Sequence, residues 1–188
     1  MDALLTAFVG ALLAEWGDRT QLFVIVLAAR FAKPGPILAG LALAALANGL
    51  VAAVGGVWVH DLIPTRALSL LVALALLMAG AGSLIRRRPP NIGARWRTGA
   101  FLTAAASLTL LEIGDKTQFL TFALAARFDS IAFAVAGATA GILVAAAPAA
   151  LLGSAFAEVV PVKPIRWAIA AVLIVTGFVV AVQALELV

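Results

Sequence analysis

Hydrophobic residues fill six long stretches of the chain, and polar residues collect in the short breaks between them. Each stretch approaches or exceeds the roughly 20 residues that an apolar helix needs to cross a bilayer. The stretches are continuous and rich in Ala, Leu and Val, which favours helices. The pattern therefore predicts six transmembrane helices over residues 3–30, 36–59, 66–85, 99–127, 131–156 and 165–187.

The composition excludes a water-soluble globule. Of the 188 residues, 64% are hydrophobic and only 12% are charged, whereas soluble domains carry roughly 25% charged residues. The net charge of +4 does not indicate nucleic-acid binding, because the basic residues lie mainly between the apolar stretches. The chain has no cysteine, which excludes disulfides and thiolate metal sites. We therefore expect an all-α integral membrane protein.

The chain contains an internal duplication, which changes how the helices are grouped. The segment from Leu12 to Phe31 matches the segment from Thr109 to Phe128, with Glu-x-Gly-Asp followed by Thr-Gln after one basic residue in both. The same offset aligns later residues without a gap: Gly40 with Gly137, Gly56 with Gly153, Pro64 with Pro161 and Gly80 with Gly177. This predicts one three-helix repeat over 1–85 and a second over 99–188, joined by a basic connection over 86–98.

The predicted repeats have opposite orientations in the membrane. Each repeat has three helices, and two consecutive odd repeats must cross the bilayer in opposite senses, as in the inverted repeats of many secondary transporters. Cytoplasmic loops are enriched in Lys and Arg, so we expect the arginine-rich connection over 86–98 to be cytoplasmic. Both termini then lie on the extracytoplasmic side. The same connection is suited to contact anionic membrane lipids.

Four acidic residues lie near the middle of apolar stretches instead of at their ends: Glu15, Asp18, Glu112 and Asp115. Arg19 and Lys116 accompany them. A charge at the bilayer centre costs at least about 2.5–3.5 kcal/mol, so residues placed there are functional candidates. Residues three or four apart share a helix face, which predicts that the charges of each motif lie on one side of its helix. The glycine inside each motif favours either an unwound turn or a close helix crossing.

The charged side chains have the chemistry of a divalent-cation site. Inverted repeats would bring the two motifs together, and carboxylate oxygens suit hard cations such as Ca²⁺, Mg²⁺ and Mn²⁺. The four carboxylates contribute −4, and Arg19 with Lys116 contributes +2, which leaves −2. One divalent cation or two protons would neutralise this charge. Competition between the cation and protons for one site is the minimal chemistry of an antiporter.

The two motifs resemble the hallmark of the manganese/calcium–proton antiporter family, which is two copies of E-x-G-D-[KR]-[ST] in repeats of opposite orientation. They read Glu15-Trp16-Gly17-Asp18-Arg19-Thr20 and Glu112-Ile113-Gly114-Asp115-Lys116-Thr117. The resemblance covers essentially the whole chain. It implies a secondary active transporter, not an enzyme, that exchanges a divalent cation for protons and uses no cofactor. Mn²⁺ is the favoured substrate and Ca²⁺ the second candidate.

The resemblance also implies roles for single residues. The cation and proton ligands would be Glu15, Asp18, Glu112 and Asp115, supported by Thr20, Gln21, Thr117 and Gln118, with Arg19 and Lys116 supplying compensating charge. The compact chain and its short basic connection fit a multi-pass protein of the bacterial inner membrane. The expected role there is export of excess manganese.

Two other functions fit parts of the pattern. A proton-coupled exporter of a small organic cation would use the same carboxylates but needs a wider, more aromatic pocket, for which Trp16 and Phe119 are the nearby residues. A non-transporting assembly subunit would use its motifs as ion pairs within each helix, Glu15 with Arg19 and Glu112 with Lys116. One chain could complete the site as a monomer, and its Gly- and Ala-rich faces would also support a homodimer.

Overall fold

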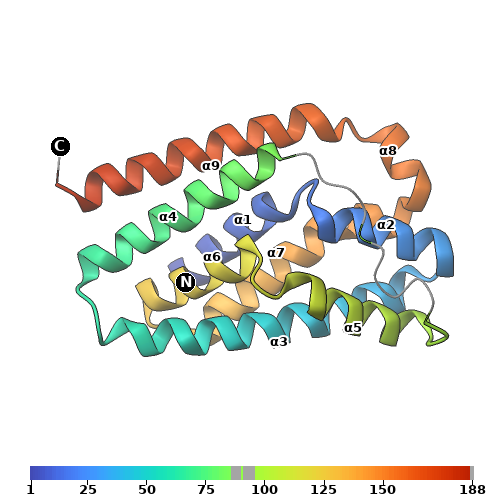
Figure 1. Ribbon diagram of the computed structural model, residues 1–188, viewed down its shortest axis with the longest axis horizontal. Coiled ribbons are helices and arrows are strands. Elements are labelled where there is room, and N and C mark those ends of the chain that lie inside the picture. Colours follow the sequence, from blue (N-terminus) through green and yellow to red (C-terminus); the bar gives the residue numbers. More distant parts are fainter. Residues whose placement is uncertain (86–89, 91–95, 187–188) are drawn as a thin grey trace.

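The computed structural model describes residues 1–85, 90 and 96–186, and every regular element in these ranges is a helix (Figure 1). Most of the predicted basic connection over 86–98, and residues 187–188 of the second repeat, lie outside the described residues. The helices are α1 (Asp2–Glu15), α2 (Arg19–Phe31), α3 (Pro34–His60), α4 (Thr65–Leu84), α5 (Ala100–Glu112), α6 (Lys116–Phe128), α7 (Ile131–Leu152), the 3₁₀ turn η1 (Gly153–Ala155), α8 (Phe156–Val159) and α9 (Val162–Ala184).

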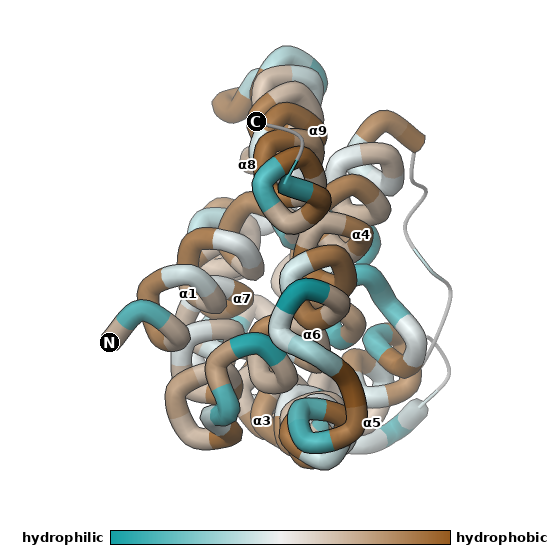
Figure 2. The backbone as a smooth tube through the Cα atoms, turned by 90° about the vertical axis from the view of Figure 1, so that its left-hand side faces the viewer, coloured by the Kyte–Doolittle hydropathy of each residue, from teal (hydrophilic) through white to brown (hydrophobic). Residues whose placement is uncertain are grey.

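Four helical segments are long and apolar enough to cross a membrane. By length and composition these are α3, α4, the segment Ile131–Val159 formed by α7, η1 and α8, and α9. Both α4 and α9 are apolar over a length that can span a bilayer, and hydrophilic residues lie at helix ends and turns (Figure 2). This distribution is typical of a multi-pass membrane protein.

The first and fourth predicted spans are not continuous helices. The first is divided into α1, of 14 residues, and α2, of 13 residues, and the fourth into α5 and α6, of 13 residues each. None of the four reaches the roughly 20 residues of a complete span. Each break coincides with a charged motif. The prediction of one uninterrupted helix through each motif was therefore wrong, and the unwound turn is the alternative that the structure contains.

Helix boundaries recur at a constant offset along the chain. The helices α6, α7 and α9 begin at Lys116, Ile131 and Val162, each 97 residues after the first residue of α2, α3 and α4. Corresponding helices run in opposite directions along the long axis of the molecule, which is clearest for the adjacent pair α4 and α9 (Figure 1). The order α2, α3, α4 thus recurs as α6, α7, α9, with the direction of each helix reversed.

Small residues let the helices that carry the motifs approach their neighbours closely. A Cβ atom at Gly137 of α7 would lie 2.3 Å from the carbonyl oxygen of Leu4 in α1. At the corresponding position, a Cβ atom at Gly40 of α3 would lie 2.7 Å from the carbonyl oxygen of Phe101 in α5. Backbones come this near only where a side chain is missing. The helices α7 and α3 therefore fix the positions of α1 and α5, and with them the two motifs.

Candidate cation site

Both motifs form unwound turns between two short helices, near the middle of the molecule (Figure 1). The helix α1 ends at Glu15, and Asp18 precedes the first residue of α2. Gly17 and Gly114 have φ values of +73° and +71°. This left-handed conformation is readily available only to glycine. The glycine of each motif therefore breaks the helix and separates its two carboxylates, so they do not share one continuous helix face as predicted.

The glutamine of each motif braces its unwound turn. The Gly17 N–H donates to Oε1 of Gln21 (2.9 Å), and Nε2 of Gln21 donates to the Ala145 carbonyl (2.6 Å). In the second motif, the Gly114 N–H donates to Oε1 of Gln118 (2.6 Å), whose Nε2 donates to a carbonyl of α3 (3.4 Å). Each glutamine thus connects the break to the facing long helix. Each Oε1 already accepts one hydrogen bond from its glycine. A role for the two glutamines as cation ligands stays a prediction.

The basic residues reach across the site to the carboxylates of the opposite motif. Nη2 of Arg19 lies 2.7 Å from Oδ1 of Asp115. Nζ of Lys116 pairs with Oδ2 of Asp18. These pairs join α2 to the second break and α6 to the first. The charges therefore hold the two halves of the protein together, whereas the pairs expected within one helix were Glu15 with Arg19 and Glu112 with Lys116.

The structure brings three of the four predicted carboxylates into one group. Glu15, Asp18 and Asp115 can each direct an oxygen atom to within 4.8 Å of the others, and all three are buried. The hydroxyl of Thr117 donates to Oε1 of Glu15. Thr20, its counterpart, is buried in the first turn of α2. This carboxylate group lies between the ends of α1 and α5 and the beginnings of α2 and α6.

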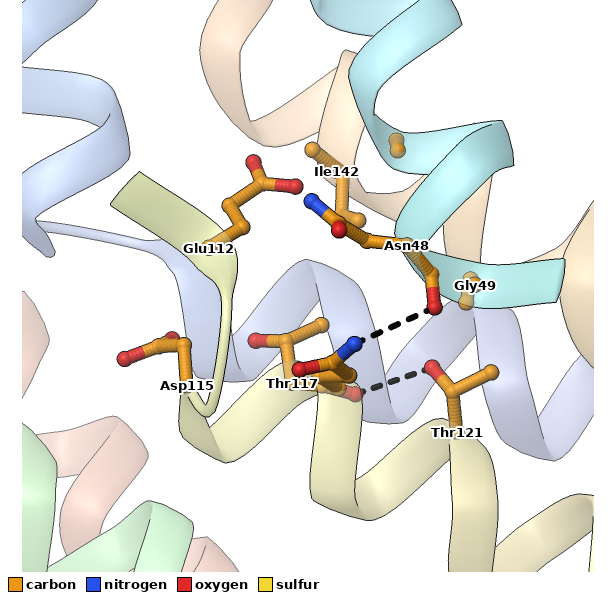
Figure 3. A pocket seen from close by; sticks show the side chains of 10 residues that line it. Asn48, Gly49, Glu112, Asp115, Thr117, Thr121 and Ile142 are labelled. Atoms are coloured by element: carbon orange, nitrogen blue, oxygen red, sulfur yellow. Dashed lines mark hydrogen bonds between the residues drawn. The ribbon is translucent and has the colours of Figure 1, made fainter. Parts of the chain in front are cut away.

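The fourth carboxylate, Glu112, lies outside this group and lines a small cavity. The cavity measures about 10 Å³, and Asn48, Asp115 and Thr117 are among the residues that line it (Figure 3). Glu112 is buried, with only 6% of its surface exposed. Asn48 was not in the predicted ligand set. The repeat contained a signal for it, because the corresponding position in the second half is Ala145.

Several oxygen atoms at the site are buried without a hydrogen-bond partner among the described residues. They are Oε2 of Glu15, Oε1 of Glu112 and Oδ2 of Asp115. Buried polar atoms are nearly always paired, so unpaired ones need an explanation such as a ligand that is absent. A set of carboxylate oxygens is the coordination that hard divalent cations prefer. The arrangement can therefore hold a small cation between the two motifs.

The two unwound turns differ in how they are covered. A Cβ atom at Gly17 would lie 2.4 Å from Cδ of Arg166 and 2.9 Å from Cγ1 of Val162, both on α9. Arg166 is held in place by bonds of 3.1 and 2.7 Å to the Ser83 carbonyl. A Cβ atom at Gly114 would meet no other described atom within 4 Å. The first turn is thus covered by α9, and the second is open.

This difference predicts unequal effects of alanine at the two glycines. Each replacement carries the cost of a positive φ, about 1–2 kcal/mol. Only Gly17→Ala also crowds Arg166, which adds about 1–3 kcal/mol of overpacking. Thermal unfolding in detergent should therefore show a larger loss of stability for Gly17→Ala than for Gly114→Ala. Equal losses would mean that α9 does not restrict the first turn.

The family model described as "Divalent cation/proton antiporter GDT1" matches residues 3–90 and 100–187. The chain belongs to this family. The resemblance noted at the motifs is confirmed, and the family is one of transporters, not enzymes. Membership also shows that the substrate is a divalent cation and that the apolar helices are those of a membrane protein.

A similar curated protein adds a more specific description. The chain is 35% identical over 167 residues to a "Putative manganese exporter" of Vibrio cholerae serotype O1, and the match covers 88% of this chain and 84% of the relative. No solved structure matches the chain.

Proposed function

We propose that this member of the divalent cation/proton antiporter family exchanges Mn²⁺ for protons and exports Mn²⁺ across the bacterial inner membrane. The observation that carries the proposal is the buried group of Glu15, Asp18 and Asp115, with Glu112 beside it, at the meeting point of two unwound helix breaks. Discontinuous membrane helices whose ends meet at midplane are the usual place for substrate and coupling ions in secondary transporters.

The charge balance of the site supports exchange against protons. Both basic side chains pair with carboxylates of the site, so they count in its net charge. Four carboxylates give −4 and the two bases give +2, which leaves −2. One Mn²⁺ or two protons bring the site to neutrality. A buried site is stable only when its net charge is zero. Such a site binds either one Mn²⁺ or two protons, and an antiporter requires this competition.

The proposed topology has six crossings. In it, α1 with α2 and α5 with α6 form two discontinuous spans, and α3, α4, α7–α8 and α9 form four complete ones. The opposite directions of corresponding helices support two inverted repeats (Figure 1). Arg30, Lys33, Lys163 and Arg166 lie in segments at the same end of the molecule as the beginning of α5 (Figure 1). With that end cytoplasmic, both termini lie outside.

The size of the cavity argues against an organic cation as substrate. A volume of about 10 Å³ beside Glu112 is close to the about 10–15 Å³ that one water molecule needs. A dehydrated metal ion fits this space, whereas an organic cation does not. Manganese is favoured over calcium because the relative from Vibrio cholerae carries the description of a manganese exporter. Because one chain holds both motifs, a monomer suffices for the site.

The proposal is tested with the purified full chain in liposomes that contain a pH-sensitive dye. Adding Mn²⁺ outside should drive protons out of the liposomes and raise the internal pH, and choline chloride should not. If neither Mn²⁺ nor Ca²⁺ moves protons, the antiport proposal is wrong. If Ca²⁺ drives proton movement at far lower concentrations than Mn²⁺, antiport stands and the choice of manganese is wrong.

A further inference from the structure

The glutamates of the two motifs have different hydrogen-bond partners. Glu15 belongs to the carboxylate group and accepts a hydrogen bond from the hydroxyl of Thr117. Glu112 lies outside that group, and the side-chain amide of Asn48 hydrogen-bonds its carboxylate. The position that corresponds to Asn48 in the other half of the chain is Ala145, which has no polar side chain. The repeat thus provides an amide partner for only one of its two glutamates.

Asn48 presents its amide nitrogen to the Glu112 carboxylate (Figure 3). The same nitrogen, Nδ2, donates to the carbonyl of Thr109 at 3.1 Å, which fixes the orientation of the amide. An amide nitrogen carries two hydrogens, so Nδ2 can serve both acceptors at once. Only 8% of Asn48 is exposed. Because a nitrogen that donates hydrogen bonds does not coordinate a cation, this amide group acts on the carboxylate.

The place of Glu112 in the chain allows its carboxylate to move. Glu112 is the last residue of α5, and the unwound turn follows it. Its Oε1 is buried without a hydrogen-bond partner among the described residues, so Asn48 does not satisfy the whole carboxylate. In a buried site, a hydrogen bond from a neutral amide is weaker than the attraction between a carboxylate and a divalent cation. A cation can therefore draw Glu112 away from Asn48.

The charges of the carboxylate group explain why Glu112 needs a partner outside it. Three carboxylates already lie together in the group, and two basic side chains pair with them. A fourth carboxylate would add a negative charge that no basic side chain balances, and like charges repel strongly in a buried site. The Asn48 amide stabilises the Glu112 carboxylate outside the group without adding charge. A divalent cation reverses this balance because it attracts all the carboxylates of the site.

We propose that Asn48 is a positioning residue that competes with the transported cation for the Glu112 carboxylate. The inference rests on the proposed function, in which Glu112 is a ligand of the cation. Binding of the cation draws Glu112 away from Asn48, and release of the cation returns it. An interaction that is lost when a ligand binds lowers the affinity for that ligand. The amide therefore weakens cation binding and favours release, which an exporter needs to complete its cycle.

The test compares Asn48→Ala in the full chain with the same substitution made in Glu112→Gln. Alanine removes the amide donor and is the residue already present at position 145, so we expect the protein to fold. Mn²⁺ affinity is measured in detergent from the loss of the free-ion EPR signal, and KM and the maximal rate are measured in liposomes. Ser83→Ala is the control, because it removes a buried hydroxyl that bonds only within α4.

Asn48→Ala should lower both the Kd and the KM for Mn²⁺ by about 10-fold. This factor corresponds to about 1.4 kcal/mol, which is close to the contribution of one hydrogen bond. The maximal rate should fall as well, because the carboxylate that releases the cation no longer has a partner. In Glu112→Gln the same substitution should leave the affinity unchanged, because the carboxylate for which Asn48 competes is missing. Ser83→Ala should change neither affinity nor rate.

Three results would overturn the inference while the proposed function stands. An unchanged Kd in Asn48→Ala would show that the amide does not compete with the cation. A raised Kd would show that Asn48 supports the bound cation instead. A lower Kd that persists when Glu112 is glutamine would show that Asn48 does not act through this carboxylate. A wild-type protein that neither binds Mn²⁺ nor moves protons would remove the proposed function itself, and the inference with it.

Discussion

Replacing Glu112 with glutamine is expected to abolish cation-driven proton movement and to leave the protein folded. The substitution keeps the size and most of the shape of the side chain. It removes one negative charge and a carboxylate that lies in the cavity at the site. The net charge of the site changes from −2 to −1, so one Mn²⁺ no longer balances it. Loss of even a supporting group at a metal site costs about 10- to 100-fold in affinity, so we expect a loss of roughly 100-fold or more.

The fold should survive because Glu112 is not one of the carboxylates in the crossed ion pairs. Those pairs use Asp18 and Asp115. A buried carboxylate replaced by a neutral amide also relieves the cost of burying its charge. The melting temperature of Glu112→Gln in detergent should therefore equal or exceed that of the wild type.

The matched control for this prediction is Glu158→Gln. Glu158 lies in α8 and is exposed, so the same chemical change occurs outside the site. Its transport in liposomes should equal that of the wild type. Wild-type transport by Glu112→Gln would remove Glu112 from the ligand set and leave the site centred on Glu15, Asp18 and Asp115.

The carboxylates of the candidate site could be singled out from the sequence because charges inside apolar stretches are conspicuous. Glu15, Asp18 and Asp115 were singled out for that reason, and the structure brings them together. The duplication was equally visible, because a gapless alignment over most of the chain does not arise by chance. The cation specificity came from the chemistry of the oxygens and from the family resemblance, and membership of the family is now shown.

The paths of the helices through the motifs could not be predicted in the same way. A glycine lowers helix stability by only about 1 kcal/mol, so its presence does not decide between a continuous helix and a break. The structure decides it, because positive φ at Gly17 and Gly114 directs Asp18 and Asp115 toward the opposite motif. The helix periodicity used for the prediction holds only while the helix continues.

The ion pairs between the two motifs could not be predicted from the sequence for a related reason. Spacing along a helix reports only neighbours on the same helix, and Arg19 is four residues from Glu15 but 96 from its partner Asp115. The position of Glu112 apart from the carboxylate group depends on the same three-dimensional arrangement. The asymmetry between Asn48 and Ala145 was present in the alignment, but only the structure shows that Asn48 lines the cavity beside Glu112.

Lys116→Met should destabilise the protein more than any other single change at the site. The paired side chains of Lys116 and Asp18 are only 6% and 5% exposed. Removing one partner of a buried ion pair leaves the other charge uncompensated and costs about 3–5 kcal/mol. Arg19→Met is the matched comparison. Arg19 is 36% exposed, so solvent already screens part of its attraction to Asp115, and the loss should be smaller.

A second substitution separates the loss of charge balance from the loss of packing. In Lys116→Met combined with Asp18→Asn, both charges of the pair are gone, and replacing a buried pair by neutral groups is often close to neutral in stability. The double variant should therefore regain most of the melting temperature that Lys116→Met loses, measured by the fluorescence of the four tryptophans. It should not regain transport, because Asp18 is a proposed ligand. If Lys116→Met alone has the melting temperature of the wild type, the pair does not balance a buried charge. The net charge of the site would then differ from −2. The exchange of one Mn²⁺ for two protons depends on that value.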